Sequence, residues 1–207
     1  MNRAPLSRLH AIATREILAL PDFVYRASAI AQHGPVAIHI RGRGLEGTTL
    51  ANAAEEVMAA APSAQLLIND RADVAKAVDA AGVHLPEAGL PTSAARTFLG
   101  ETRWIGRSVH NPVDVPAALE TGADYLFLGP IWPTASHPGT PGLGPQVLKE
   151  MRKGPVFAIG GVTPDNVGAA REAGAYGVAA VRALWLARDP GSVARAMLLS
   201  LEREDDA

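Results

Sequence analysis

Three features of the sequence predict an α/β protein in which eight parallel strands close into a (β/α)8 barrel. Short apolar runs alternate with longer Ala-rich stretches along the chain. Several of these runs are apolar throughout, which is typical of strands that are covered on both faces. Strict alternation of strand and helix indicates a parallel sheet, and eight such units suit a barrel. With 207 residues the chain lies near the lower limit for this fold, and a doubly wound open sheet is the alternative.

Eight segments have the length and apolar content of strands. The second reads "PVAIHIR", the sixth "DYLFLG" and the seventh "PVFAIG", each bounded by residues that favour turns. The predicted strands are 9–13, 35–41, 65–69, 82–85, 102–109, 124–129, 155–160 and 176–181.

The segments between these strands have helical character. Residues 48–60 open with threonines that suit a helix cap and continue in strong helix formers. In the segment 164–173 we expect Thr163 as N-cap, Pro164 at the first helical position and Gly174 after the last turn. The other helices are expected at 70–80, 112–121 and 145–153.

Composition and charge narrow the class of protein. Hydrophobic residues make up 48% and charged residues 19%, as in an ordinary globular domain, and we expect one domain over 1–207 with its core at about 9–190. The net charge of -2 does not favour nucleic acid or an anionic membrane as a partner. The absence of cysteine excludes disulfides and thiolate metal sites, and no apolar run has the ~20 residues of a membrane span. We therefore expect a cytoplasmic protein and leave homo-oligomerisation open.

In a barrel of this kind the chemistry lies at the carboxyl ends of the strands. Nearly every predicted strand ends in polar residues or glycine, which places them around one mouth. In strand order these residues are His39, Arg41, Arg43, Asn69, Asp70, His84, Ser108, His110, Gly129, His137, Gly160, Gly161 and Arg182.

The glycine pair after the seventh strand predicts a phosphate site. Exposed backbone N–H groups beside a helix start attract an anion, and Arg182 after the eighth strand would add a charged donor. The alternative is that Gly160 and Gly161 only make a tight turn while Arg182 points to solvent.

The second strand ends in alternating polar residues. A period of two places His39, Arg41 and Arg43 on one side, where three cations would require an anion. The alternative is a solvated strand end. After the third strand, Asn69 could bind a ring nitrogen and Asp70 could hold Mg²⁺, whereas the simpler interpretation makes Asp70 a helix cap.

Ser108 and His110 lie two residues apart at the end of the fifth strand, so they share one side of it. Serine is a small donor, and histidine moves protons near neutral pH; a cap or loop role is the alternative for His110. His84 lies inside an apolar strand, where a core histidine is the commoner interpretation. The Pro/Gly-rich loop from Gly129 to His137 is long enough to cover a substrate.

These segments together resemble the thiamin phosphate synthase/TenI superfamily. The motifs "GVHL", "IGRSVH", "GADYLFLGPIWPTASHPG" and "AIGGVTPDNV" stand in the family's order between about Leu9 and Leu184. The resemblance implies a (β/α)8 barrel, also called a TIM barrel, that acts in thiamin biosynthesis and binds a phosphorylated thiazole. Synthases of this family join a pyrimidine methyl pyrophosphate to thiazole phosphate with Mg²⁺, whereas TenI-type tautomerases aromatise a thiazole phosphate carboxylate by proton transfer without metal.

The sequence departs from the synthase pattern where metal and pyrophosphate would bind. Pro86-Glu87 replaces the run that carries the second metal carboxylate, and His137 stands where a lysine is expected. Arg182 replaces a serine after the eighth strand, and His10 replaces an early tyrosine.

We therefore expect a TenI-like tautomerase with no cofactor. The resemblance implies His110 as its acid/base, with His39, His84 or a substrate carboxylate as partner, and Gly160, Gly161 and Arg182 at the phosphate. Substrate contacts are expected from Arg41, Arg43, Asn69, Ser108, Gly129 and His137.

Two alternatives stay open. One is a divergent synthase, in which Asp70, and Glu87 from a shifted position, would hold Mg²⁺. The other is a non-catalytic protein on the same barrel that binds the thiazole phosphate and regulates a neighbouring enzyme.

Overall fold

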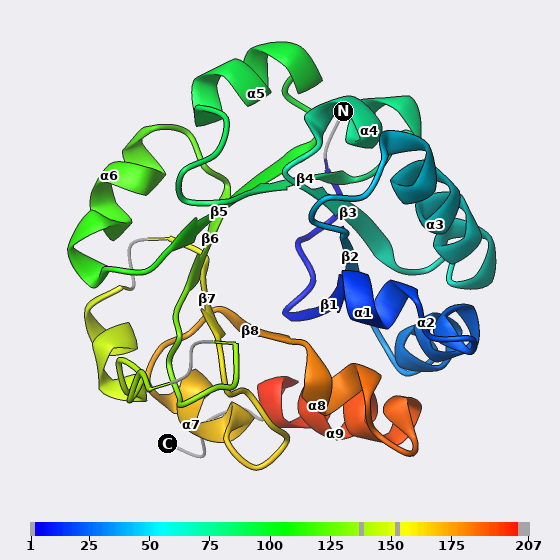
Figure 1. Cartoon of the computed structure of the whole chain (residues 1–207). Coiled ribbons are helices and arrows are strands. Elements are labelled where there is room, and N and C mark those ends of the chain that lie inside the picture. Colours follow the sequence, from blue (N-terminus) through cyan, green and yellow to red (C-terminus); the bar gives the residue numbers. More distant parts are fainter. Residues whose placement is uncertain (1–2, 137–138, 152–153, 203–207) are drawn as a thin grey trace.

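The computed structural model, which describes residues 3–136, 139–151 and 154–202, confirms the closed parallel barrel (Figure 1). Each strand pairs in parallel with its neighbour in the sequence, and the first strand also pairs with the eighth. The open-sheet alternative is excluded, because an open sheet has no bond between its first and last strands. The strands are β1 (Leu9–Thr14), β2 (Val36–Arg41), β3 (Gln65–Asn69), β4 (Gly82–Leu85), β5 (Trp104–Val109), β6 (Tyr125–Leu128), β7 (Val156–Ile159) and β8 (Gly177–Ala180).

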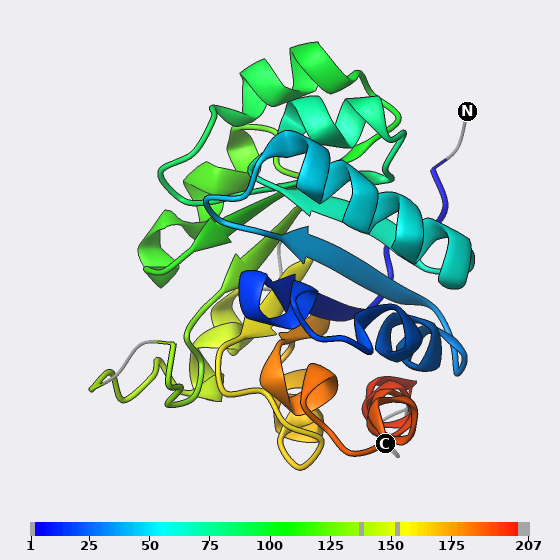
Figure 2. The ribbon, with the colours of Figure 1, turned by 45° about the vertical axis from the view of Figure 1, so that its right-hand side comes forward.

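Helices surround the barrel on its outer side (Figures 1 and 2). They are α1 (Arg15–Leu18), α2 (Phe23–Ala31), α3 (Gly47–Ala60), α4 (Ala72–Ala77), α5 (Thr92–Leu99), α6 (Val115–Glu120), α7 (Val167–Glu172), α8 (Arg182–Trp185) and α9 (Pro190–Glu202), with the 3₁₀ turns η1 (Pro112–Asp114) and η2 (Pro145–Glu150). None of the described helices is both long and apolar enough to cross a membrane.

Three expectations about helix boundaries are wrong. The helix expected from Pro164 begins at Val167, because the Asn166 side chain accepts a hydrogen bond from the Thr163 N–H and closes a turn first. Asp70 caps no helix: it adopts a φ of 66°, and Arg71 precedes α4. The described part of 145–153 forms a 3₁₀ turn.

The strands separate two apolar cores. The larger core lies between the sheet and the helices and includes Ile38, Ile40 and Ile68. The smaller core fills the barrel interior and includes Ile12, Tyr125, Phe127 and Phe157, with which three buried histidines pack. Those histidines are His10, His39 and His84.

Tyr125 fits into the barrel because the facing residue on β5 has no side chain. Gly106 is the register partner of Tyr125, and a Cβ atom at Gly106 would overlap the Tyr125 ring. The packing of the interior therefore depends on glycine at position 106, opposite the large side chain of Tyr125.

We predict that Gly106→Ala lowers the free energy of unfolding by about 1 to 3 kcal/mol, because the added methyl group overpacks the interior. The matched control is Gly168→Ala in α7, where a Cβ atom would meet nothing within 4 Å. That control should gain roughly 0.5 to 1 kcal/mol through lower backbone entropy. Urea denaturation of both variants measures the difference, and equal stabilities would contradict this account of the interior.

Candidate functional site

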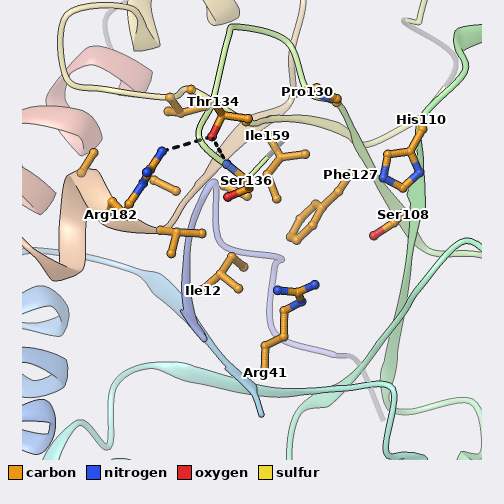
Figure 3. A pocket seen from close by; sticks show the side chains of 18 of the residues that line it. Ile12, Arg41, Ser108, His110, Phe127, Pro130, Thr134, Ser136, Ile159 and Arg182 are labelled. Carbon is orange, nitrogen blue, oxygen red and sulfur yellow. Dashed lines mark hydrogen bonds between the residues drawn. The ribbon is translucent and has the colours of Figure 1, made fainter. Parts of the chain in front are cut away.

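A cavity of about 750 Å³ lies at the carboxyl ends of the strands. Its walls contain residues from β1, β2, β3, β4, β5, β6, β7 and β8 or from the loops that follow them (Figure 3). Most residues that the sequence placed at the mouth line this cavity: Arg41, Arg43, Asn69, His84, Ser108, His110, Gly129, Gly160, Gly161 and Arg182. His137 lies outside the described residues.

Sequence reasoning missed part of the lining. Ile12, Phe127 and Ile159 form an apolar floor, which the expected site residues did not include, whereas Thr134 and Ser136 belong to the loop after β6 that the sequence predicts at the mouth. The alternation of apolar residues could have identified Phe127 as interior. No signal distinguished an interior residue at the cavity from one deeper in the barrel.

The glycine turn after β7 lies at one end of the cavity. Gly160 and Gly161 have φ values of 87° and 68°, which L side chains rarely adopt. A Cβ atom at Gly160 would lie 2.6 Å from the Pro130 Cβ, so the turn also packs closely against the loop after β6. Both the turn geometry and this close packing require glycine.

Asn166 fixes the shape of this turn. Its amide Nδ2 donates to the Gly161 carbonyl at 2.9 Å, and its Oδ1 accepts from the Thr163 N–H at 2.9 Å. Across the turn, Arg182 Nη2 donates to the Thr134 hydroxyl at 3.3 Å (Figure 3). A guanidinium, a hydroxyl and a glycine turn thus come together as an anion site would require.

His110 forms a close pair with Glu87. The His110 Nδ1 lies 2.9 Å from Glu87 Oε2, and the His110 backbone N–H donates to Oε1 at 3.1 Å. These bonds to His110 hold the pKa of the Glu87 carboxyl below its ordinary value. Because a carboxylate only accepts hydrogen bonds, the proton of a neutral His110 ring stands on Nδ1 and Nε2 is the basic nitrogen. Glu87 is therefore a hydrogen-bond partner of His110.

His84 connects the barrel interior to the cavity. Its Nδ1 lies 3.2 Å from the Tyr125 hydroxyl, and its Nε2 lies 2.9 Å from the Ser108 hydroxyl. Burial lowers the pKa of His84 and raises that of Tyr125, so both side chains are neutral. The Tyr125 proton has no other acceptor among the described residues, so Tyr125 donates to His84 and His84 Nε2–H donates to Ser108. The Ser108 proton is then available to the cavity.

His39 does not line the cavity. It is fully buried, and its ring lies between His10 and Asn69, with Nε2 2.8 Å from His10 Nδ1 and Nδ1 3.0 Å from the Asn69 amide. Burial lowers the pKa of His39 to about 4. The expectation that His39 adds a third cation beside Arg41 and Arg43 is therefore wrong, and a direct catalytic contact for His39 is not supported.

The residues present do not form the expected pair of magnesium carboxylates. Both oxygens of Glu87 are engaged by His110, which leaves Asp70 as the remaining carboxylate of that pair. Over the described ranges, no group of three or more His, Cys, Asp or Glu side chains could hold a metal ion. Because Mg²⁺ is commonly held by one or two carboxylates together with substrate phosphates, Asp70 is the residue that would hold it in a synthase.

Because these histidines are buried and neutral, we predict that the free energy of unfolding decreases as the pH is lowered from about 6.5 to 4. The unfolded chain protonates these rings below about pH 6.5, whereas folded His39 does so only near pH 4. Below pH 6.5 the unfolded state binds more protons, so the free energy of unfolding decreases, by on the order of 3 kcal/mol for His39 alone.

Urea denaturation from pH 7.5 to 4.5 checks this slope. His33→Gln removes an exposed histidine and serves as the control, with an unchanged slope expected. A free energy of unfolding that stays constant over this range would contradict neutral burial of the three rings.

Comparison with known proteins extends over most of the chain. Residues 9–184 match the family model described as thiamine monophosphate synthase. A thiamine-phosphate synthase of Saccharopolyspora erythraea is 37% identical over 193 residues, which cover 87% of this chain and 86% of that protein. One from Thermosynechococcus vestitus is 41% identical over 143 residues, but these span only 41% of its length.

Solved structures with the same fold include one from this family and others with different names. The structure of a thiamine phosphate pyrophosphorylase from Pyrococcus furiosus superposes with a TM-score of 0.74 at 27% identity, covering 94% of this chain and 95% of that one. A 3-hexulose-6-phosphate synthase shares the fold at a TM-score of 0.71 and 17% identity, with 94% of this chain and 100% of that one covered. The family match and the closed barrel agree with the resemblance carried by the motifs, and the chain belongs to the thiamine monophosphate synthase/TenI family.

Proposed function

We propose that this protein is an enzyme of thiamin biosynthesis that isomerises a thiazole phosphate carboxylate by proton transfer, as TenI-type tautomerases do. The observation that carries this proposal is the pairing of Glu87 with His110, which lines the cavity. Family membership supports a phosphorylated thiazole as the ligand, and the glycine turn with Arg182 supports a place for its phosphate. We further propose that the protein works in the cytoplasm without nucleic acid as a partner.

The phosphate would bind beside Gly160 and Gly161, where Arg182 and the Thr134 hydroxyl supply donors. The ring would then lie over the apolar floor made by Ile12, Phe127 and Ile159. Arg41 reaches into the same cavity from β2 and could hold the substrate carboxylate (Figure 3). Two anionic groups on one substrate would thus meet cations that come from different strands.

His110 has the hydrogen bonding of an acid/base. Its Nδ1 proton is held by Glu87, so Nε2 takes a proton from a substrate carbon and the resulting imidazolium is stabilised by the carboxylate. The same nitrogen returns a proton to the other end of the conjugated system. One C–H bond breaks and another forms, so the product is an isomer and no leaving group or oxidant is required.

The second candidate is a divergent thiamin phosphate synthase, and the names of the relatives favour it. That reaction forms a bond between a pyrimidine methyl group and the thiazole nitrogen and releases pyrophosphate. Mg²⁺ would neutralise the leaving group, and Asp70 would have to hold it together with a Glu87 released from His110. The engagement of Glu87 is the reason that we place this candidate second.

We predict that the protein isomerises the thiazole phosphate carboxylate without added metal and that His110→Ala lowers kcat by about 10²- to 10⁴-fold. Glu87→Gln should lower kcat by roughly 10- to 100-fold, since the ring loses its charged partner but keeps Nε2. NMR spectra of substrate and product, recorded with excess chelator, measure both rates.

His33→Ala, which changes an exposed histidine away from the cavity, is the control and should retain full activity. Formation of thiamin phosphate only with Mg²⁺ and a pyrimidine pyrophosphate would replace this proposal by the synthase. Tight binding without turnover in either assay would leave a non-catalytic binder.

A further inference from the structure

A chain of hydrogen bonds crosses the barrel interior from the backbone of Ser7 to the cavity. His10 Nε2 lies 2.9 Å from the Ser7 carbonyl oxygen, and His10 Nδ1 lies 2.8 Å from His39 Nε2. His39 Nδ1 in turn lies 3.0 Å from the side-chain amide of Asn69, which is placed with its Oδ1 toward the ring. Both imidazole rings are fully buried, whereas Asn69 is half-buried and lines the cavity.

One end of this chain fixes the position of every proton in it. The Ser7 carbonyl only accepts, so His10 carries a proton on Nε2 and a neutral His10 presents an acceptor at Nδ1. His39 must then donate from Nε2, and a neutral His39 presents an acceptor at Nδ1. The Asn69 amide atom that faces His39 must therefore be a donor, so hydrogen bonding requires Nδ2 at the place where the structure has Oδ1.

The opposite amide orientation would require a buried charge. With Asn69 Oδ1 facing His39, one of the two rings would have to carry a second proton. The rings around them are Tyr125, Phe127 and Phe157, and no carboxylate contacts His10 or His39 among the described residues. A charged group in such surroundings is strongly disfavoured, and burial lowers the pKa of both histidines.

An amide side chain has nearly the same shape in its two orientations, so the packing around Asn69 accommodates either one. Hydrogen bonding alone decides between them. We propose that His10 and His39 act as positioning residues that hold Asn69 with its Nδ2 toward His39 and its Oδ1 toward the cavity.

This orientation gives the cavity wall a defined polarity. Asn69 offers an acceptor, so the ligand group beside it must be a donor such as N–H or O–H and not a carboxylate or a phosphate. Ser108 offers a donor for the reason given above, because His84 Nε2–H already occupies its oxygen. Asn69 therefore selects a hydrogen-bond donor on the ligand, and Ser108 selects an acceptor. This inference does not depend on which reaction the enzyme performs.

The test is the tautomeric state of the histidines in the ligand-free protein. Long-range ¹H–¹⁵N correlation spectra of protein labelled at histidine distinguish protonated from unprotonated ring nitrogens. All three buried histidines lie against the Phe127 ring, so further cross-relaxation must distinguish them. Within the described chain only His10 also contacts Phe157, and His84 but not His39 contacts the Tyr125 ring. At pH 7.5 we expect both rings to be neutral with the proton on Nε2. A doubly protonated ring, or a proton on His39 Nδ1, would overturn the proposal.

Asn69→Asp provides a second readout, because a carboxylate cannot donate to His39. We expect His39 to gain a proton on Nδ1 in this variant, and an unchanged His39 spectrum would contradict the proposal. The matched control is Asn111→Asp, which places the same new charge at an exposed turn where the side chain accepts from Val113. His10 and His39 should have wild-type spectra in that control.

Discussion

The hydrogen bonding between β1 and β8 is the constraint on which the rest of the structure depends. Closing the parallel sheet brings the carboxyl ends of all eight strands to one mouth, so residues as distant in sequence as Arg41 and Arg182 line one cavity. Closure also encloses an interior, which Tyr125, Phe127 and Phe157 fill together with histidine rings. The position of the site and the packing of the interior both follow from the pairing of β1 with β8.

The interior histidines show how such a barrel accommodates polar groups. Each ring is neutral because burial lowers its pKa, and each nitrogen of His10, His39 and His84 has a hydrogen-bond partner. A neutral imidazole has one donor and one acceptor. In a chain of such rings, the direction of the first hydrogen bond at the backbone therefore fixes the direction of every later one, up to the wall of the cavity. His10 and His39 would thus influence the polarity of the cavity wall without lining the cavity themselves.

Sequence patterns were sufficient for the strands, the parallel sheet and the residues at the mouth, because apolar periodicity and position in a barrel determine these features. They were insufficient for contacts made by side chains across loops. The Glu87–His110 pair joins residues after β4 and β5, and no spacing rule relates them. The start of α7 was misplaced because Pro164 satisfies the local rule for a first helical residue, whereas the Asn166 side chain closes a turn there. His10 was noted only as a substitution, since its role depends on Ser7 and His39.

The central claim is that the cavity is built for one phosphate and a proton transfer, with Glu87 committed to His110 and not to a metal. Calorimetric titration with thiazole phosphate and, separately, with pyrophosphate tests it most directly, each with and without Mg²⁺. The account predicts that thiazole phosphate binds equally well in both conditions and that Mg²⁺ does not improve pyrophosphate binding. Tight pyrophosphate binding that requires Mg²⁺ would contradict it and would identify Asp70 and Glu87 as metal ligands.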